Sequence, residues 1–362
     1  MIGYTEYRTD LPGGRWANEI TMRAGVVGAD GAGRRALAGE LTREPHTWTQ
    51  FSGWSPDGRL AVIGQGWESP ENGAWEEEHH NFRFTPEGWR YDMHLLDLDS
   101  GRAENLTAIE RVSFYNTGLF FWPGDPQRLG FQALINGISH PFSMDRDGRN
   151  KRDLSQGPEG FAYGFSASPD GWRIAYHKAY QIHLADADGG NLLQVRTGNP
   201  FNFVPQWSPG GDWLLFLSGE HYDCHPHLVR PDGTGLRQLA GRNGYRGVVE
   251  FLDVPDFHGG SSDVPIWSPD GEWVYFTARM GQSVELMRVS VNGQVERLTH
   301  SAPGTLHYHP QVSPDACRLV YGSKRQGQRQ LYVMDLETRC EHPVTQLGQG
   351  WGAMWAHWQR QG

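Results

Sequence analysis

The stretch VPIWSPDGEWVYFTA, residues 264–278, contains the pattern that decides the fold. Its central phrase, Ser-Pro-Asp-Gly, stands between two short apolar runs. Pro presets one backbone dihedral of a β-turn, Asp accepts hydrogen bonds from nearby backbone amides, and Gly tolerates positive φ. The phrase therefore predicts a hairpin turn between two strands.

The same phrase recurs along the chain. Its copies are FSGWSPDG at 51–58, FSASPDG at 165–171, VPQWSPGG at 204–211 and HPQVSPDA at 309–316, and a partial match, FFWPGD, stands at 120–125. Apolar runs and a second turn of the DxDG kind follow most of them, so each unit contains four short strands. Four-stranded units spaced about 40 to 65 residues apart are typical of β-propeller blades.

The pattern predicts an all-β fold: a seven-bladed β-propeller with four-stranded blades, forming a single domain over residues 1–362. Six turns indicate six blades. The seventh is expected to be split, because a C-terminal strand at 354–358 has no turn after it and three N-terminal strands, at 4–8, 20–30 and 34–39, lack an innermost partner. Joining the two ends would remove open edge strands.

Composition narrows the possible partners and locations. The net charge is −10 and no basic stripe occurs, which argues against a nucleic-acid partner. Three cysteines without CxxC spacing argue against a disulfide framework or a thiolate zinc site. The N-terminus lacks the basic and apolar segments of a secretory signal, and no apolar run is long enough for a bilayer, so we expect a cytoplasmic protein without a membrane partner.

Two histidines stand at the start of a predicted innermost strand, in the phrase TLHYHP at 305–310. Residues two apart on a strand point the same way, so His307 and His309 are expected to face one side near the central channel. That spacing suits two ligands of one metal ion. The alternative is that both imidazoles cap the strand and bond to backbone carbonyls.

A second histidine cluster, EHYDCHPH at 220–227, is predicted in a loop between the second and third strands of the fifth blade. A neutral imidazole is a plausible base near pH 7, which makes His221 a candidate base and His225 and His227 candidate substrate-binding residues. The alternative is a polar loop with adventitious metal affinity. Two longer stretches, 67–90 and 244–262, are expected to form ordered lids over one face.

Residues 307–335, HYHPQVSPDACRLVYGSKRQGQRQLYVMD, resemble the last complete blade of the oligogalacturonate lyases, which are TolB-like seven-bladed propellers of the cytoplasm. In that family two histidines of an HPHP phrase bind a catalytic manganese ion, which implies metal roles for His307 and His309. The resemblance also implies that His221, counted back from Asp232-Gly233, is the catalytic base. Arg196 takes, by position, the place of the family's assisting arginine.

The chain departs from the family at two ligand positions. Gly304 stands where the family has a metal-binding Gln, and Asp263-Val264 stands where it has a further ligand His. The metal shell must therefore differ. We expect Asp263, or His258 from the long loop, to complete the shell of a divalent ion, with Mn²⁺ the expected metal.

The resemblance implies a metal-dependent lyase that cleaves uronic-acid-containing oligosaccharides by β-elimination, with an acidic oligosaccharide as substrate. The metal would hold the sugar carboxylate, His221 would take the C5 proton and Arg196 would offset charge. Two alternatives stay open: different chemistry at the same metal site, such as epimerisation, and a non-catalytic TolB-like propeller that binds a protein or carbohydrate. No GxSxG phrase occurs, which argues against a serine hydrolase.

Overall fold

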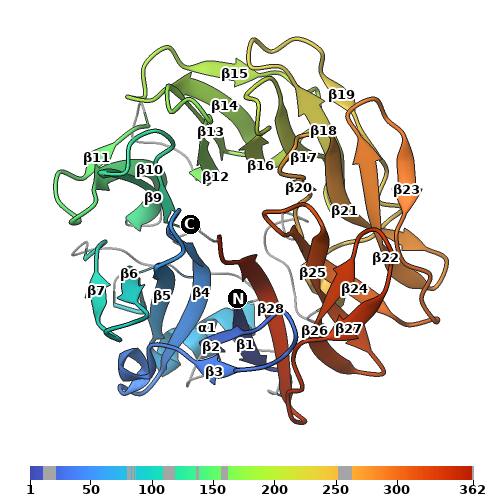
Figure 1. Ribbon diagram of the computed structural model, residues 1–362. Coiled ribbons are helices and arrows are strands. Elements are labelled where there is room, and N and C mark those ends of the chain that lie inside the picture. Colours follow the sequence, from blue (N-terminus) through green and yellow to red (C-terminus); the bar gives the residue numbers. More distant parts are fainter. Residues whose placement is uncertain are drawn as a thin grey trace.

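The computed structural model of the chain describes residues 1–10, 22–79, 83, 85, 87–108, 119–135, 138–155, 162–251 and 263–360. Antiparallel strands dominate these residues, and they lie in several sheets around a common centre in an all-β, propeller-like arrangement (Figure 1). Tight turns join most neighbouring strands, as the Ser-Pro-Asp-Gly phrases predict.

Within the described residues, four sheets have four strands each. The first contains β4 (Thr47–Trp54), β5 (Leu60–Glu68), β6 (Trp89–Asp97) and β7 (Ala103–Asn105). The second contains β8 (Phe120–Phe121), β9 (Arg128–Ile135), β10 (Ile138–Asp145) and β11 (Arg152–Asp153). The third contains β12 (Ala162–Ala167), β13 (Arg173–Lys178), β14 (Gln181–Asp186) and β15 (Leu193–Val195). The fourth contains β16 (Phe201–Trp207), β17 (Leu214–Glu220), β18 (Asp223–Val229) and β19 (Arg237–Gln238).

The remaining described strands form one twelve-stranded sheet. It begins with β20 (Ile266–Trp267), β21 (Trp273–Met280), β22 (Ser283–Ser290) and β23 (Val295–Arg297). It continues with β24 (Leu306–Val312), β25 (Arg318–Arg325), β26 (Gln328–Asp335) and β27 (Glu341–Pro343). It ends with β28 (Trp351–Trp358), β1 (Ile2–Arg8), β2 (Met22–Val27) and β3 (Arg35–Ala36).

The two ends of the chain meet in this sheet. The C-terminal strand β28 pairs antiparallel with β1, with Ile2 opposite Trp358 and Arg8 opposite Trp351. Two parallel bridges, Val284 to Leu306 and Arg329 to Gly352, join its three groups of four strands. Since each bridge pairs a single residue from each strand, the three groups remain distinct units within the sheet.

Aromatic side chains and glycines pair across the inner strands. Trp48 on β4 lies opposite Gly66 on β5, and Tyr308 on β24 lies opposite Gly322 on β25. A Cβ atom on Gly66 would come within 2.1 Å of the Trp48 ring, and one on Gly322 within 2.0 Å of the Tyr308 ring. The ring therefore occupies the place of the missing side chain, which lets adjacent strands pack closely.

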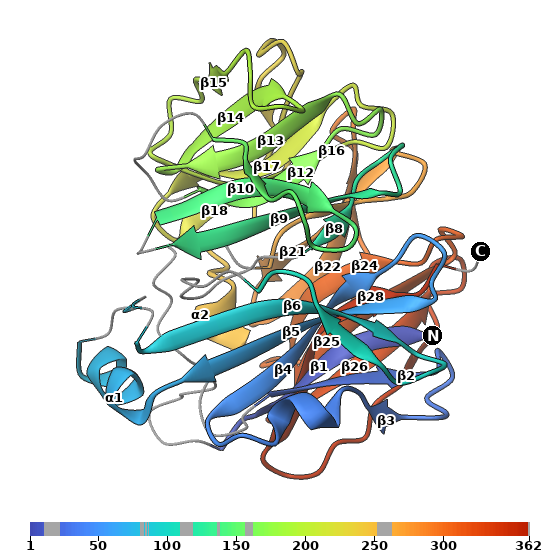
Figure 2. The same ribbon diagram turned by 90° about the vertical axis from the view of Figure 1, so that its left-hand side faces the viewer.

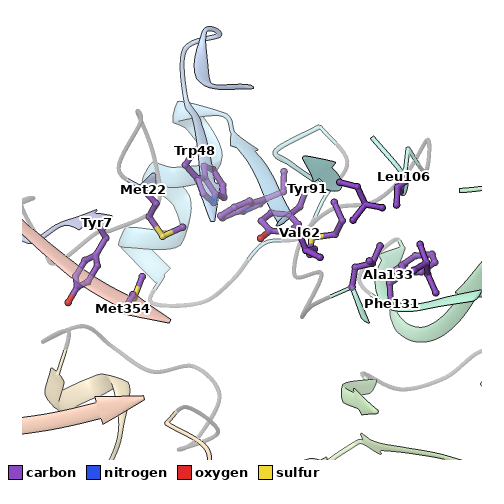
Figure 3. Packing of buried hydrophobic residues seen from close by; sticks show 14 of the residues in the cluster. Tyr7, Met22, Trp48, Val62, Tyr91, Leu106, Phe131, Ala133 and Met354 are labelled. Carbon is purple, nitrogen blue, oxygen red and sulfur yellow. The ribbon is translucent and has the colours of Figure 1, made fainter. Parts of the chain in front are cut away.

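The apolar core is divided among the sheets and their contacts. One buried cluster brings Tyr7, Met22 and Met354 from the two chain ends together with Trp48 and Phe131 from the following two sheets (Figure 3). It therefore stabilises the meeting of the N- and C-terminal strands as well as the sheets beside them.

Among the described residues, two α-helices interrupt the strands, α1 (Pro70–His79) between β5 and β6 and α2 (Val248–Phe251) between β19 and β20, besides a short 3-10 helix at Gly39–Thr42. Both lie on the same side of the molecule in Figure 2. They belong to the two long stretches that the sequence marked as lids, although α1 was not predicted as a helix. In the described part of the chain, neither helix has the length and apolarity that a membrane crossing requires.

Candidate functional site

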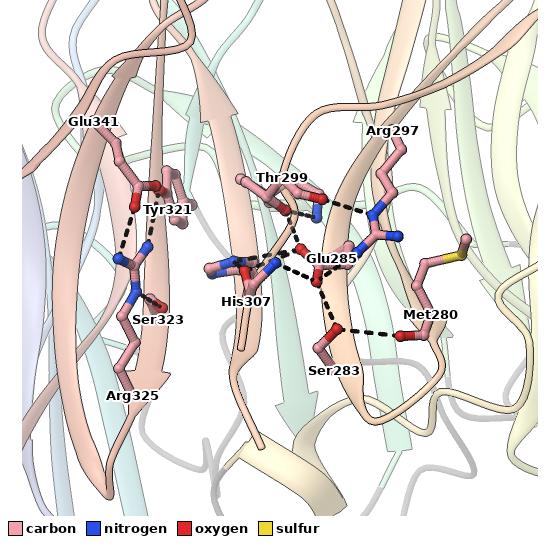
Figure 4. Close-up of polar contacts among 12 residues, drawn as sticks. Met280, Ser283, Glu285, Arg297, Thr299, His307, Tyr321, Ser323, Arg325 and Glu341 are labelled. Carbon is pink, nitrogen blue, oxygen red and sulfur yellow. Dashed lines mark hydrogen bonds and ion pairs between the residues drawn. The ribbon is translucent and has the colours of Figure 1, made fainter. Parts of the chain in front are cut away.

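His307 lies in β24 and is fully buried, with 0% of its surface exposed. Its Nε2 is 2.8 Å from the Ser301 hydroxyl and 3.8 Å from the Glu285 carboxylate, and its ring meets Tyr321 edge to face (Figure 4). Burial and the Arg325 charge lower the pKa of His307 to about 4, although Glu285 opposes the shift. The imidazole is therefore neutral near pH 7.

Glu285 organises the polar network around His307. Its buried carboxylate accepts hydrogen bonds from the hydroxyls of Ser283 and Thr299 at 2.5 Å and from the Ser301 backbone amide at 2.9 Å. Arg297 adds an ion pair at 3.0 Å. Burial alone raises the pKa of Glu285, but these hydrogen bonds outweigh burial and lower it. The network links β22 with β24, and its hydrogen bonds stabilise this contact.

His309 has different neighbours from His307. Its ring contacts Phe251 of α2 edge to face and lies nearly parallel to Trp355 of β28, with ring centres 6.0 Å apart. The backbone at His309 is left-handed, with φ of 50°, and the β24–β25 register shifts between Tyr308 and Gln311. The regular alternation that was expected to turn both imidazoles to one side therefore does not hold here.

Asp263 joins His309 to a buried charged cluster. Its Oδ1 accepts a hydrogen bond from the His309 backbone amide, and its Oδ2 accepts one from the Thr277 hydroxyl, both at 2.6 Å. Arg242 Nη2 is 3.9 Å from Asp263 Oδ2, and its guanidinium lies over the Tyr245 ring at 4.8 Å. We call Arg242, Tyr245, Asp263 and His309 the Asp263 cluster.

Several polar atoms of the Asp263 cluster are buried without a hydrogen-bond partner among the described residues: Arg242 Nη2, the Tyr245 hydroxyl and His309 Nδ1. Burial lowers the pKa of His309 despite the nearby Asp263 carboxylate. Burial, reinforced by Asp263, raises the pKa of Tyr245 well above its usual value. The cluster thus holds a neutral imidazole and a neutral phenol beside an ion pair.

His221 lies in the turn between β17 and β18, where it is exposed and its ring contacts Phe201 and Tyr222. Arg196 follows β15 and is also exposed. No contact described in the structure joins either residue to the Asp263 cluster. Their predicted roles as base and assisting arginine stay predictions.

His225 and His227 lie within β18, not in the loop expected from the sequence. His225 Nδ1 accepts a hydrogen bond from the backbone amide of Arg242 at 3.3 Å, which places it beside the Asp263 cluster. His227 is buried, with 8% of its surface exposed, and contacts Phe216. Burial lowers the pKa of both imidazoles.

The predicted metal ligands do not form a fitted metal site in the described part of the chain. His307 and His309 have separate partners, and both Asp263 oxygens already accept hydrogen bonds near the Arg242 charge. Among the described residues, no group of three or more His, Cys, Asp or Glu side chains is arranged to hold a metal ion. His258, the remaining predicted ligand, lies outside these residues.

Sequence reasoning did not identify Arg242, Tyr245 or Glu285. Glu285 stands between Val284 and Leu286 in β22, and Arg242 and Tyr245 follow a short outer strand without a recognisable motif. A carboxylate flanked by apolar residues in a strand was a usable signal, because a buried carboxylate requires hydrogen-bonding partners.

Comparisons with known proteins agree with the propeller-like fold. No family model matches the chain. An uncharacterized protein of Agrobacterium fabrum is 32% identical over 169 residues, covering 46% of this chain and 48% of that protein. A TolB homolog of Chlorobium luteolum is 29% identical over 158 residues, covering 44% of this chain and 32% of that protein. The chain thus matches about half or less of the length of these curated relatives.

The chain is also similar to a solved structure of oligogalacturonate lyase in complex with manganese. The identity is 16%, the match covers 90% of this chain and 86% of that one, and the TM-score is 0.61. At this identity the likeness concerns the fold and leaves the chemistry to the site residues. The chain has a TolB-like β-propeller fold of the kind that oligogalacturonate lyase also has.

Proposed function

We propose that residues 1–362 form a single domain, a seven-bladed propeller whose ring is closed by β28 joining β1, β2 and β3. The described pairings support this proposal because they divide into groups of four strands, four as separate sheets and three within the twelve-stranded sheet. Antiparallel pairing of β28 with β1 is the contact that closure requires.

On this scaffold we propose a lyase that cleaves uronic-acid-containing oligosaccharides by β-elimination. The observation that carries the proposal is the Asp263 cluster, in which Arg242 and Tyr245 are only 2% exposed and Arg242 Nη2 makes no described contact closer than its ion pair with Asp263 at 3.9 Å. Burying such groups is costly, and perturbed buried groups of this kind gather at functional sites. The cluster contacts His225, which follows His221 by four residues along the chain.

The chemistry requires a base and a positive environment. In β-elimination the base removes the proton at C5, beside the sugar carboxylate, and the group linked at C4 then leaves. We propose that the exposed His221 takes this proton and that His225 and His227 orient the sugar. Arg196, and Arg242 through its buried charge, would offset the negative charge that develops next to the carboxylate.

The proposal keeps an acidic oligosaccharide as substrate and a cytoplasmic location. A divalent ion, with manganese expected, also remains a prediction, but no step is assigned to it because the described His307, His309 and Asp263 do not fit a metal site. Metal analysis of untagged protein, compared with the double variant His307→Ala/His309→Ala, tests that prediction separately.

The alternative is a non-catalytic propeller that binds a protein or carbohydrate. One observation favours it: among the described residues, no group of three or more His, Cys, Asp or Glu side chains could hold a metal. A binding module needs neither a metal nor a base, and propeller folds serve both purposes.

The deciding experiment incubates the full chain with oligogalacturonates, with and without added Mn²⁺, and follows the ultraviolet absorbance of the unsaturated product. We expect absorbance to rise with the wild type and with His79→Ala, a control at an exposed histidine of α1, and to be lost with His221→Ala. Binding measured by calorimetry without any product would identify the binding module. Neither product nor binding would refute both functions for uronides.

A further inference from the structure

Trp172 is an unusual residue in the third copy of the hairpin turn along the chain. It stands four residues after the Ser of its Ser-Pro-Asp-Gly phrase, where the other full copies have Arg59, Asp212, Glu272 and Cys317. The turn therefore does not require an aromatic residue at this position. Trp172 is nevertheless 75% exposed, more than any other exposed large hydrophobic side chain that the structure describes. Exposing so much of an indole to water is unfavourable, and an indole beside a cleft offers a flat apolar face to a ligand.

Neighbouring tryptophans show the ordinary alternative. Trp213 and Trp273 each stand five residues after the serine of their own turn, one position later than Trp172 does. The guanidinium groups of Arg230 and Arg237 lie over the Trp213 ring, and that of Arg288 lies over the Trp273 ring. No ring or cation contact to Trp172 is found among the described residues. Its indole face is therefore available to a ligand.

Trp172 borders a cleft of about 860 Å³ between the sheet of β8–β11 and the sheet of β12–β15. The turns between β8 and β9, β10 and β11, and β14 and β15, together with the strand ends beside them, supply the rest of its lining. A cleft of this volume suits a small ligand or a few residues of an oligomer. Its lining shares no residue with the Asp263 cluster, whose members come from β24 and from the connections on either side of α2.

The walls of the cleft are polar and held in place. Arg128 donates a hydrogen bond to the Ala187 carbonyl at 2.7 Å, and Asn150 donates one to the Asp145 carboxylate at 2.6 Å. These bonds fix the side chains before a ligand arrives, which lowers the entropic cost of binding.

The charges of the cleft nearly balance, so they offer an anionic ligand no net attraction. Four aspartates and three arginines line it, so its net charge is slightly negative and donors stand close to acceptors. A neutral sugar fits this surface, because each hydroxyl both donates and accepts a hydrogen bond while the C–H face of the ring packs on an indole. A uronide carboxylate would meet aspartates as well as arginines in this cleft.

We propose that this cleft is a second carbohydrate site, which binds neutral oligosaccharides with Trp172 as the stacking platform. The site is independent of the proposed lyase centre and requires no chemistry. It would hold a neutral glycan, or neutral stretches of a mixed one, on the molecule at a distance from the Asp263 cluster.

The test presents the full chain to an array of defined neutral and uronic-acid oligosaccharides and then measures affinity for the bound ones by calorimetry. We expect neutral oligosaccharides to bind, Trp172→Ala to weaken that binding roughly tenfold, and Trp172→Phe to restore part of it. Leu193→Ala is the matched control, because Leu193 is an exposed apolar residue of the same sheet, 41% exposed, outside the cleft lining. It should bind like the wild type.

Three outcomes would overturn the proposal. They are the absence of binding to every neutral oligosaccharide, equal affinity in the wild type and Trp172→Ala, and a Trp172-dependent association with a protein in place of a glycan. The unfolding midpoint of Trp172→Ala should equal that of the wild type, because the side chain is largely exposed. No lyase activity enters this test, so failure of the lyase proposal leaves it intact.

Discussion

Replacing Glu285 by alanine should destabilise the protein more than any surface carboxylate replacement. Glu285 is 0% exposed and accepts hydrogen bonds from the Thr299 hydroxyl and the Ser301 backbone amide, besides its ion pair with Arg297. In Glu285→Ala these donors lose an acceptor inside the protein, where water does not replace it. A lost buried acceptor and a broken buried ion pair together cost about 3–5 kcal/mol.

Denaturant unfolding, followed by fluorescence and circular dichroism, measures this cost as a shift of the midpoint at constant slope. Glu296→Ala is the matched control, because Glu296 also pairs with arginines, Arg288 and Arg339, but its side chain is 38% exposed. Exposed ion pairs contribute at most about 1 kcal/mol. Glu285→Gln keeps the shape and one acceptor, so its cost should lie between those of the other two variants.

The reasoning would be refuted if Glu285→Ala lowered the free energy of unfolding no more than Glu296→Ala does. It would also be refuted if Glu285→Gln were as stable as the wild type, because the network depends on a charged acceptor. Either result would mean that the Glu285 network between β22 and β24 contributes little to stability.

Three further predictions concern stability. The pKa of His307 is lowered from 6.5 to about 4 in the folded chain, so the unfolded chain binds a proton first as the pH falls. The free energy of unfolding should therefore decrease as the pH falls from 6.5 to about 4, and it should decrease less steeply in His307→Gln, as unfolding measured at several pH values would show. Gly322→Ala should lower the free energy of unfolding by about 1–3 kcal/mol, because the new Cβ atom would collide with the Tyr308 ring. Gly39→Ala is the control: a Cβ atom at Gly39 has no neighbour within 4 Å, so thermal melts should show no change in stability. Tyr308→Phe removes the buried hydrogen bond, 2.8 Å long, that the Tyr308 hydroxyl donates to the Ala353 carbonyl between β24 and β28. Denaturant titration should show a free energy of unfolding lower by about 1–3 kcal/mol. An unchanged unfolding midpoint would contradict this hydrogen bond.

The local fold could be predicted from the sequence because its turns carry their own chemistry. In the turn at Ser55, the hydroxyl donates to the Asp57 carboxylate at 2.5 Å and Asp57 in turn accepts from the Arg59 backbone amide. The same Ser-to-Asp bond recurs at Ser268 and Ser313. The phrase therefore specifies the turn through contacts within five residues, and neighbouring strand positions follow from it.

Helix α1 could not be predicted in the same way. It docks through polar side chains: Asn72 donates to both Glu68 and Glu76, and Glu76 also accepts from the Trp89 indole at 2.7 Å. Its sequence lacks the apolar stripe of helical period by which surface helices are usually predicted. The bonds of Asn72 are local, but the Trp89 contact forms only when β6 returns beside the helix, so docking of the helix depends on the completed fold.

The candidate site was predicted only in part for a related reason. Asp263 and His309 could be marked from the sequence, but their contact spans 46 residues and joins the backbone of one to the side chain of the other. Arg242 reaches the cluster from an outer-strand connection that carries no motif. Residue type identifies possible participants, whereas the return of distant strands determines which of them meet.

The repeat itself indicates why the backbone at His309, unlike that at His307, departs from regular strand geometry. Left-handed backbone recurs four residues before the turn serine at Gly164, Val204 and His309, and at the corresponding place in β28 at Trp355. These positions meet between neighbouring sheets: a Cβ on Gly164 would approach Val204 within 2.4 Å, and the His309 and Trp355 rings lie nearly parallel. The bulge removes the side chain from the regular alternation of the strand, so its identity is not constrained by packing within its own sheet. A polar residue can therefore be placed there without disturbing a blade, whereas His307 is held within the Glu285 network.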